Sequence, residues 1–273
     1  MRGATCFFAR PRFPPRTAII RVVSHSDMAG RESFFWHKLH SLTGIIPVGF
    51  YMVQHLTLNS FTLAGPDAYN GVIQFFEHLP FHVLVVLKYG IVWLPLLFHA
   101  IYGFMIYSRA DFYQSPQAAQ YRENKMFMFQ RWSGAFAFVF LCYHMMTTSV
   151  AGALKGAENV IYYDRWASHL ASFGYAVLIF YMAGILTCAY HLSYGIWNFC
   201  IRWGITISEA AQSRVAKFSG AAFVLLTLLG WVALAGFFVS PLKPASQANS
   251  IPAGEHETRI MNPAPSMGAS LQR

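Results

Sequence analysis

Residues 81–107 read FHVLVVLKYGIVWLPLLFHAIYGFMIY, and this stretch decides what kind of protein the chain is. A helix needs about 20 mostly apolar residues to cross the hydrocarbon core of a membrane, and the stretch is longer than that. Lys88 is its only charged residue. His99 lies deep inside it, where a polar side chain is costly and usually serves a function. The stretch therefore predicts a membrane-spanning helix that carries a functional histidine.

The rest of the chain has the same character. Of its 273 residues, 55% are hydrophobic and 11% are charged, whereas an ordinary soluble domain has about 25% charged residues. The sequence predicts an all-α integral membrane protein, a bundle of five transmembrane helices, because four further apolar runs lack the alternation that barrel strands need. The predicted spans are residues 41–63, 81–107, 130–150, 168–199 and 215–239.

Lysine and arginine gather at one set of span ends. They are frequent before the first span, between the second and third, and between the fourth and fifth, and sparser in the other connections. The positive-inside bias therefore places the N-terminus in the cytoplasm and the C-terminus outside. The net charge of +9 follows mostly from this bias and from a basic leader, so it does not indicate nucleic acid as a partner.

Three regions follow from this pattern. Residues 1–32 form a basic leader, predicted to be disordered or to reflect a misassigned start, with translation beginning at Met28. Residues 33–240 form the five-helix transmembrane domain. Residues 241–273, rich in Pro, Ala, Ser and Asn, are predicted to be a disordered tail.

The four cysteines are widely scattered, and no CxxC or CxxCH motif occurs. The sequence therefore predicts no iron–sulfur or zinc site and no covalently attached haem in this chain.

Three more histidines interrupt apolar runs as His99 does: His55, His144 and His191. At 1.5 Å per residue, His55 and His144 lie about 20 Å from the inner ends of their spans. His99 and His191 lie about 15 Å from theirs. The chain thus offers two levels in the membrane, each with one histidine from each of two helices.

Two imidazoles that face each other across a bundle core form a bis-histidine haem site. Zinc or copper would need a third or fourth ligand at the same level. For any single histidine, a hydrogen bond to a neighbouring helix carbonyl is the alternative. Small residues in the same spans leave room for a flat ring, although glycines also serve ordinary helix packing. These residues are Gly44, Gly49, Gly103, Gly134, Gly184 and Gly195.

Five segments carry a family resemblance. They are KLHSLTGIIPVGFYMVQHL (38–56), FFEHLPF (75–81), LPLLFHAIYG (94–103), MFMFQRWSG (126–134) and HLSYGIWNFCIRWGIT (191–206). Together they resemble the cytochrome b subunit of succinate dehydrogenase and fumarate reductase, in the class with one five-helix anchor and two haems. The similarity covers about residues 33–238 and includes all four candidate ligands in order.

The resemblance implies two non-covalent haem b groups. It pairs His55 with His144 on the outer haem iron, and His99 with His191 on the inner one. It also implies a flavoprotein subunit with covalent FAD and an iron–sulfur subunit on the cytoplasmic face, in a bacterial cytoplasmic membrane. The chain is then a non-catalytic electron-transfer subunit, which passes electrons from the iron–sulfur subunit to the inner haem, the outer haem and a membrane quinone. Menaquinone suits this arrangement because the membrane potential can drive uphill succinate oxidation.

Two further sets of site residues rest on the resemblance. Arg202, with His40 and Ser41, is expected to contact the inner haem propionates; the alternative for Arg202 is a positive-inside anchor. Glu77 is expected beside the outer haem as the group that transfers protons with the quinone. The alternative for Glu77 is a solvated loop acid or a helix-terminal charge. Some fumarate reductase relatives carry a buried Glu where this chain has Ala189, so a built-in proton return is in doubt here.

Two other classes of function remain open at this point. One is the cytochrome b anchor of another quinone-linked dehydrogenase, of the hydrogenase, formate dehydrogenase or nitrate reductase type. The other is a haem-free transporter or receptor that uses polar residues within the membrane. The remaining histidines sit at or beyond span ends and are expected to be solvated: His25, His37, His78, His82, His169 and His256.

Overall fold

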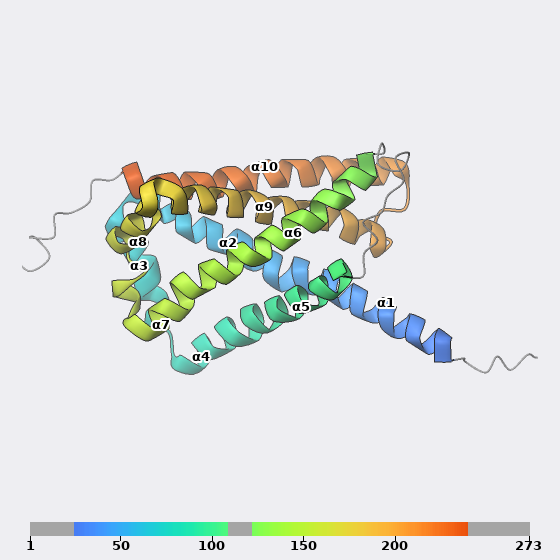
Figure 1. The fold of residues 1–273 in the computed structure, drawn as a ribbon, viewed down its shortest axis with the longest axis horizontal. Helices are drawn as coiled ribbons and strands as arrows, with labels where there is room; N and C mark the ends of the chain where they lie inside the picture. Colours follow the sequence, from blue (N-terminus) through green and yellow to red (C-terminus); the bar gives the residue numbers. More distant parts are fainter. Residues whose placement is uncertain (1–24, 109–121, 240–273) are drawn as a thin grey trace, which may run out of the picture. The chain divides into compact units, whose positions relative to one another are not determined.

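The computed structural model describes residues 25–108 and 122–239, with side chains from residue 34 and from residue 124 onward in the two ranges. Every regular element in these ranges is helical, so the predicted all-α class is confirmed for the described part of the chain (Figure 1). The predicted leader up to residue 24 and the predicted tail lie outside the described residues.

The chain separates into two compact units, residues 1–39 and residues 40–273. The described part of the first unit is residues 25–39, which belong to helix α1 (His25–Thr43). The second unit begins at His40 and contains all the candidate site residues.

The elements of the second unit follow α1 in chain order. They are η1 (Gly44–Gly49), α2 (Phe50–Asn59), η2 (Ser60–Ala64), α3 (Pro66–Glu77), α4 (Phe81–Val85), η3 (Val86–Trp93), α5 (Leu94–Ser108), α6 (Arg122–Met145), η5 (Met146–Val150), α7 (Ala151–Lys155), η6 (Ala157–Asn159), α8 (Tyr163–Leu170), α9 (Ser172–Arg202) and α10 (Glu209–Val239). The segments η1, η3 and η5 are π-helical, and η2 and η6 are 3₁₀-helical.

Four helices in the described ranges are long and apolar enough to cross a membrane: Phe81–Ser108, Asn124–Lys155, Ser172–Arg202 and Glu209–Val239. They correspond to the second, third, fourth and fifth predicted spans. A multi-pass membrane protein is therefore confirmed.

The first predicted span, residues 41–63, is helical from end to end through α1, η1, α2 and η2, but it is not among those four helices. Its second half carries Gln54, His55, Thr57 and Asn59 close together. These polar side chains lower its hydropathy, although the backbone forms a continuous helical run of transmembrane length.

The fourth span differs from its predicted bounds. Prediction placed its start at residue 168, but residues 163–170 form the separate short helix α8, and α9 begins at Ser172. Phe173, Gly174 and Tyr175 have positive φ angles of 53°, 64° and 67°. Because the sequence stays apolar through this left-handed turn, hydrophobicity alone gives no sign of the break.

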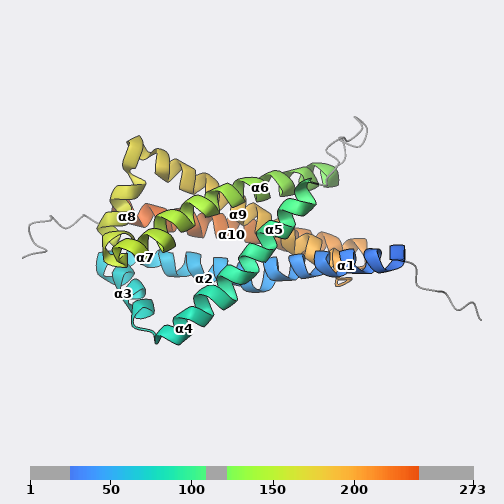
Figure 2. The same ribbon diagram turned by 60° about the horizontal axis from the view of Figure 1, so that its bottom comes forward.

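Helix α9 is the centre of the packing. It lies along α10 and is crossed by α6, and α10 also packs against α2 and η2 (Figures 1 and 2). The largest buried cluster joins α3, α6, α8, α9 and α10 through aromatic side chains such as Tyr69, Phe140 and Phe237. Hydrogen bonds from Tyr163 to Asn70 (2.9 Å) and to the Gly236 carbonyl (2.6 Å) tie α8 to α3 and α10. The short helices α3 and α8 thereby close one end of the bundle.

Candidate functional site

The structure brings the four predicted ligands together as two pairs. His55 of α2 and His144 of α6 have ring centroids 5.7 Å apart, with the ring planes at 74°. His99 of α5 and His191 of α9 have centroids 6.2 Å apart, at 85°. These are the two pairs that lie at matching levels when the rise per residue is counted along each span. The two histidines of each pair come from different helices.

In the His99–His191 pair, the Nδ1 atom of each ring is hydrogen-bonded to a backbone carbonyl. Nδ1 of His99 donates to the carbonyl oxygen of His40 at 2.9 Å, and Nδ1 of His191 donates to that of Gln130 at 3.1 Å. A carbonyl can only accept, so the proton of each ring is on Nδ1 and the lone pair is on Nε2. The side-chain amide of Gln130 also donates to the His191 carbonyl at 3.1 Å, which fixes the two helices to each other at this level.

The other pair is held by side chains. Nδ1 of His144 lies 3.2 Å from the hydroxyl of Tyr181 on α9. The amide nitrogen of Asn59 donates to the His55 carbonyl at 2.8 Å and lies 3.4 Å from Nε2 of the same ring. Sequence reasoning missed Tyr181, because the spacing of residues along one helix does not show which side chain a neighbouring helix turns toward it.

A comparison with known proteins now gives this geometry a context. No protein-family model matches the chain. The succinate dehydrogenase cytochrome b558 subunit of Bacillus subtilis (strain 168) is 36% identical to it over 210 residues, which cover 77% of this chain and 100% of that relative. The chain belongs to the family of succinate dehydrogenase cytochrome b subunits. The resemblance that the five sequence segments indicated is thereby confirmed, and a membrane cytochrome agrees with the four long apolar helices.

Membership in a cytochrome b family makes haem b the group to test against the two pairs. A metal–imidazole nitrogen distance is about 2 Å. Two rings ligating one iron from opposite sides therefore have centroids about 6 Å apart, once about 1 Å from nitrogen to centroid is added on each side. The observed 5.7 Å and 6.2 Å agree with this spacing, which is also that of ordinary edge-on ring packing. No group of three or more His, Cys, Asp or Glu that could hold a metal occurs among the described residues.

Three of the six predicted glycines lie directly against histidine rings. A Cβ on Gly44 would collide with the His99 ring, a Cβ on Gly134 would lie 2.7 Å from Cε1 of His191, and a Cβ on Gly103 would lie 3.0 Å from Cε1 of His40. These glycines therefore set how close the rings lie to the facing helices. The others meet ordinary packing neighbours: Leu192 for Gly49, Phe140 for Gly184, and Gln130 with Ile45 for Gly195.

The predicted propionate partners gather next to the His99–His191 pair. The His40 ring stacks on that of His99 with centroids 4.0 Å apart, and the positive charge of Arg202 is close enough to disfavour a charged His40. Nδ1 of His40 is buried and has no hydrogen-bond partner. Ser41 accepts a hydrogen bond from the Trp203 indole at 3.1 Å. The parallel stacking of His40 and His99 rules out a metal between those two rings, because their nitrogens do not face each other.

Glu77 lies at the end of α3 and is exposed. Its Oε2 accepts a hydrogen bond of 3.2 Å from the hydroxyl of Tyr162. The pKa of Tyr162 is raised, first by burial and also by the negative charges of Glu77 and Glu158. Tyr162 therefore remains a proton donor toward the carboxylate.

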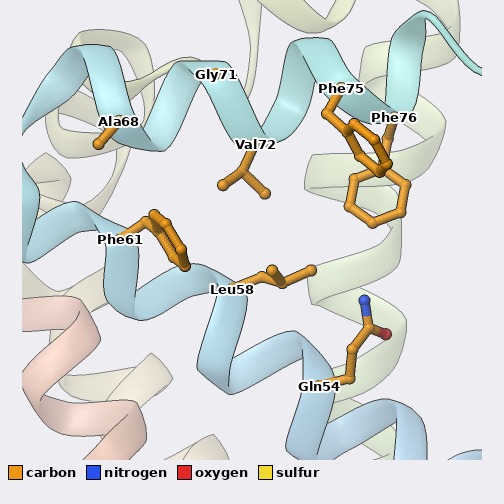
Figure 3. Close-up of a pocket in the computed structure, with 8 residues that line it drawn as sticks. All are labelled: Gln54, Leu58, Phe61, Ala68, Gly71, Val72, Phe75 and Phe76. Carbon is orange, nitrogen blue, oxygen red and sulfur yellow. The ribbon is translucent and has the colours of Figure 1, made fainter.

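An apolar cavity of about 560 Å³, largely open to the outside, lies between α3 on one side and α2 with η2 on the other (Figure 3). Leu58 and Phe61 of one wall face Val72 of the other. Gln54, the chain neighbour of His55, and Phe76, the chain neighbour of Glu77, line the same cavity. The helices that carry His55 and Glu77 thus form the two walls of the cavity.

Two other predicted positions can be placed. Ala189 is fully buried and packs with Leu56 and Leu226 in an apolar cluster. His169 was expected to be solvated, but it is half-buried: its ring stacks on Trp166 at 4.8 Å, and its Nε2 lies 3.3 Å from the Tyr143 hydroxyl. That expectation was wrong because α8 folds back onto the bundle instead of continuing into α9.

Proposed function

We propose that the chain is the membrane anchor and di-haem cytochrome b subunit of a succinate:quinone oxidoreductase, with five spans and a cytoplasmic N-terminus. It carries electrons between an iron–sulfur subunit and a membrane quinone. The observation that carries the proposal is the presence of two histidine pairs, each from two helices and each with ring centroids about 6 Å apart. Family membership supports the succinate dehydrogenase complex as the setting.

His55 and His144 would ligate the outer haem iron, and His99 and His191 the inner one. Haem b supplies reversible one-electron redox chemistry when it is bound. The protein's part is ligation, orientation and exclusion of water. The Nδ1 hydrogen bonds of His99 and His191 support this assignment, because they leave Nε2 available to the metal and fix the ring orientation.

His40, Ser41 and Arg202 would hold the inner haem propionates. Support comes from the buried, unpartnered Nδ1 of His40, since a buried polar atom without a partner is costly and a propionate oxygen could satisfy it. Arg202 would supply the positive charge at the inner boundary.

Glu77 would exchange protons with the quinone at the outer site. Its contact with Tyr162 and its place on α3, the helix that forms one wall of the apolar cavity, support this role. An apolar cavity with few polar groups is typical of a small-molecule site, and here it would admit the quinone, which we propose to be menaquinone.

The basic connections would face the cytoplasm and dock the flavoprotein and iron–sulfur subunits, which carry the FAD and clusters that this chain does not provide. The bundle would then sit in a bacterial cytoplasmic membrane with α3 and α8 at the outer surface.

The test is purification of the complex from the membrane through a tag on this chain. The expected result is co-purification of a flavin-containing and an iron–sulfur subunit, with two protohaems per chain by pyridine haemochromogen and dithionite-reduced spectra typical of low-spin haem b. A purified chain that contains no haem and no redox subunits would overturn the proposal.

A further inference from the structure

The candidate outer ligand His144 differs from the two candidate inner ligands in the group that contacts its Nδ1 atom. Its Nδ1 contacts the hydroxyl of Tyr181, whereas His99 and His191 donate to carbonyls. Tyr181 is only 4% exposed, and its ring packs edge-on against Phe140 at 5.2 Å. A hydroxyl can donate or accept, so the partners of Tyr181 decide which tautomer His144 adopts.

Thr147 offers an acceptor for the proton of Tyr181. Its hydroxyl donates to the carbonyl oxygen of Tyr143 at 2.9 Å, and its Oγ1 lies 3.4 Å from the hydroxyl of Tyr181. The single proton of Thr147 goes to the carbonyl, so its Oγ1 can accept the proton of Tyr181. With Nε2 of His144 on the iron, as proposed above, Nδ1 carries the ring proton and Tyr181 turns its own proton to Thr147. The Tyr181 oxygen then accepts from Nδ1–H of His144.

We propose that Tyr181 is a positioning residue for the outer haem. With Thr147 it fixes the Nδ1-protonated tautomer of His144 and raises the basicity of that ligand, and it thereby lowers the reduction potential of the outer haem. Hydrogen bonding from the second ring nitrogen makes an imidazole a better donor to a metal, and a better donor favours the ferric state. The proposal rests on the proposed ligation by His55 and His144.

The two proposed haem sites differ in the kind of group that contacts the Nδ1 atoms of their ligands. At the inner site both ring nitrogens donate to backbone carbonyls, and the hydroxyl of Ser133 is a more distant contact of His191 Nδ1 at 3.5 Å. The partner at the outer site is a side chain, so one substitution can change it without touching either ligand. A substitution of Tyr181 should therefore change the reduction potential of the outer haem, and with it the potential difference between the two haems.

The experiment is a redox titration of Tyr181→Phe in the complete complex, followed by visible and EPR spectra. Loss of a hydrogen-bond partner of a metal ligand typically costs about 10-fold to 100-fold in metal affinity or activity. Taking about tenfold as the loss in relative affinity of the site for ferric over ferrous haem, we expect that ratio to fall about tenfold at the outer haem. For a one-electron couple this is an upward shift of about 59 mV. The inner haem should not shift. Thr147→Val should raise the outer potential less, because Tyr181 keeps its hydroxyl but loses the acceptor that orients it.

Tyr163→Phe is the matched control. It also removes a buried tyrosine hydroxyl, one that donates to the Gly236 carbonyl at 2.6 Å, and it should leave both potentials unchanged. The proposal is overturned if Tyr181→Phe shifts the outer haem no more than Tyr163→Phe does, or shifts both haems equally. If Tyr181→Phe fails to assemble, the potential of Thr147→Val decides in the same way.

A separate variant distinguishes this proposal from the ligation on which it rests. If His144→Ala retains both haems, the proposed ligation itself is wrong. If His144→Ala loses the outer haem while Tyr181→Phe leaves its potential unchanged, only the role of Tyr181 is wrong.

Discussion

Replacing Gly134 by alanine should disturb the inner haem site through a single methyl group. The added Cβ would lie 2.7 Å from Cε1 of His191, whereas ordinary contact begins at 3.4 Å. The ring must therefore retreat by about 0.7 Å, while ligand distances at metal sites hold within about 0.2 Å. Either the proposed iron–nitrogen bond breaks, or α6 moves away from α9 at an overpacking cost of about 1–3 kcal/mol in the free energy of unfolding.

The assay compares Gly134→Ala with Gly220→Ala in the purified complex. A Cβ on Gly220 meets nothing within 4 Å, so this control makes the same chemical change without a clash, and alanine there should be neutral or favour the helix by up to about 1 kcal/mol. Haem content, the reduced spectrum and thermal stability in detergent are measured for both.

We expect Gly134→Ala to lose or perturb the inner haem and to unfold at lower temperature, while the outer haem spectrum remains. A Gly134→Ala complex with both haems, unshifted potentials and the thermal stability of Gly220→Ala would refute the reasoning, because it would show that the His191 ring is not held against α6.

Four other predictions test the proposed function. Alanine in place of either histidine of one pair should remove one haem and leave the other, by pyridine haemochromogen; an alanine variant of any of the four that keeps both haems would contradict the pairing. Glu77→Gln should leave both spectra intact and slow quinone-linked turnover about 100-fold, with little effect on succinate oxidation by a soluble dye, whereas the exposed-acid control Asp164→Asn should behave as wild type. Reporter fusions at Ser208 and Asn159 should report the cytoplasm and the exterior respectively, and the reverse result would invert the topology. Uncouplers should slow succinate oxidation by intact cells, and their failure to do so would remove the proposed role of the membrane potential.

Much of the site could be predicted because it depends on distance along a helix. The rise per residue alone placed His55 level with His144 and His99 level with His191, and the structure brings these rings together. The contact of Tyr181 with His144 could not be predicted in this way. It depends on how α9 is rotated against α6, and no spacing within one helix encodes that rotation.

The fold could likewise be predicted in part from the sequence. Apolar run length predicted five spans, and four of them correspond to long apolar helices of the described ranges, because the cost of exposing polar groups to lipid acts on every residue of a span. It could not locate the separate helix α8 or the left-handed turn at residues 173–175, since the aromatic residues Phe173 and Tyr175 continue the apolar character of α9 through the turn. The half-buried His169 was missed for the same reason.

The π-helical segments bear on how this chain aligns with its relatives. Segment η1 begins at Gly44 and ends before His55, and η3 ends before His99. A π-turn holds one residue more than the α-turn it replaces, and one residue turns an α-helix by about 100°. A relative whose helix is regular at η1 would therefore keep the same side chains facing the bundle with one residue fewer before the equivalent of His55. Single-residue gaps between sequences should accordingly occur inside the membrane spans, at residues 44–49 and 86–93, and an alignment that moves them into the loops would pair residues from different helix faces.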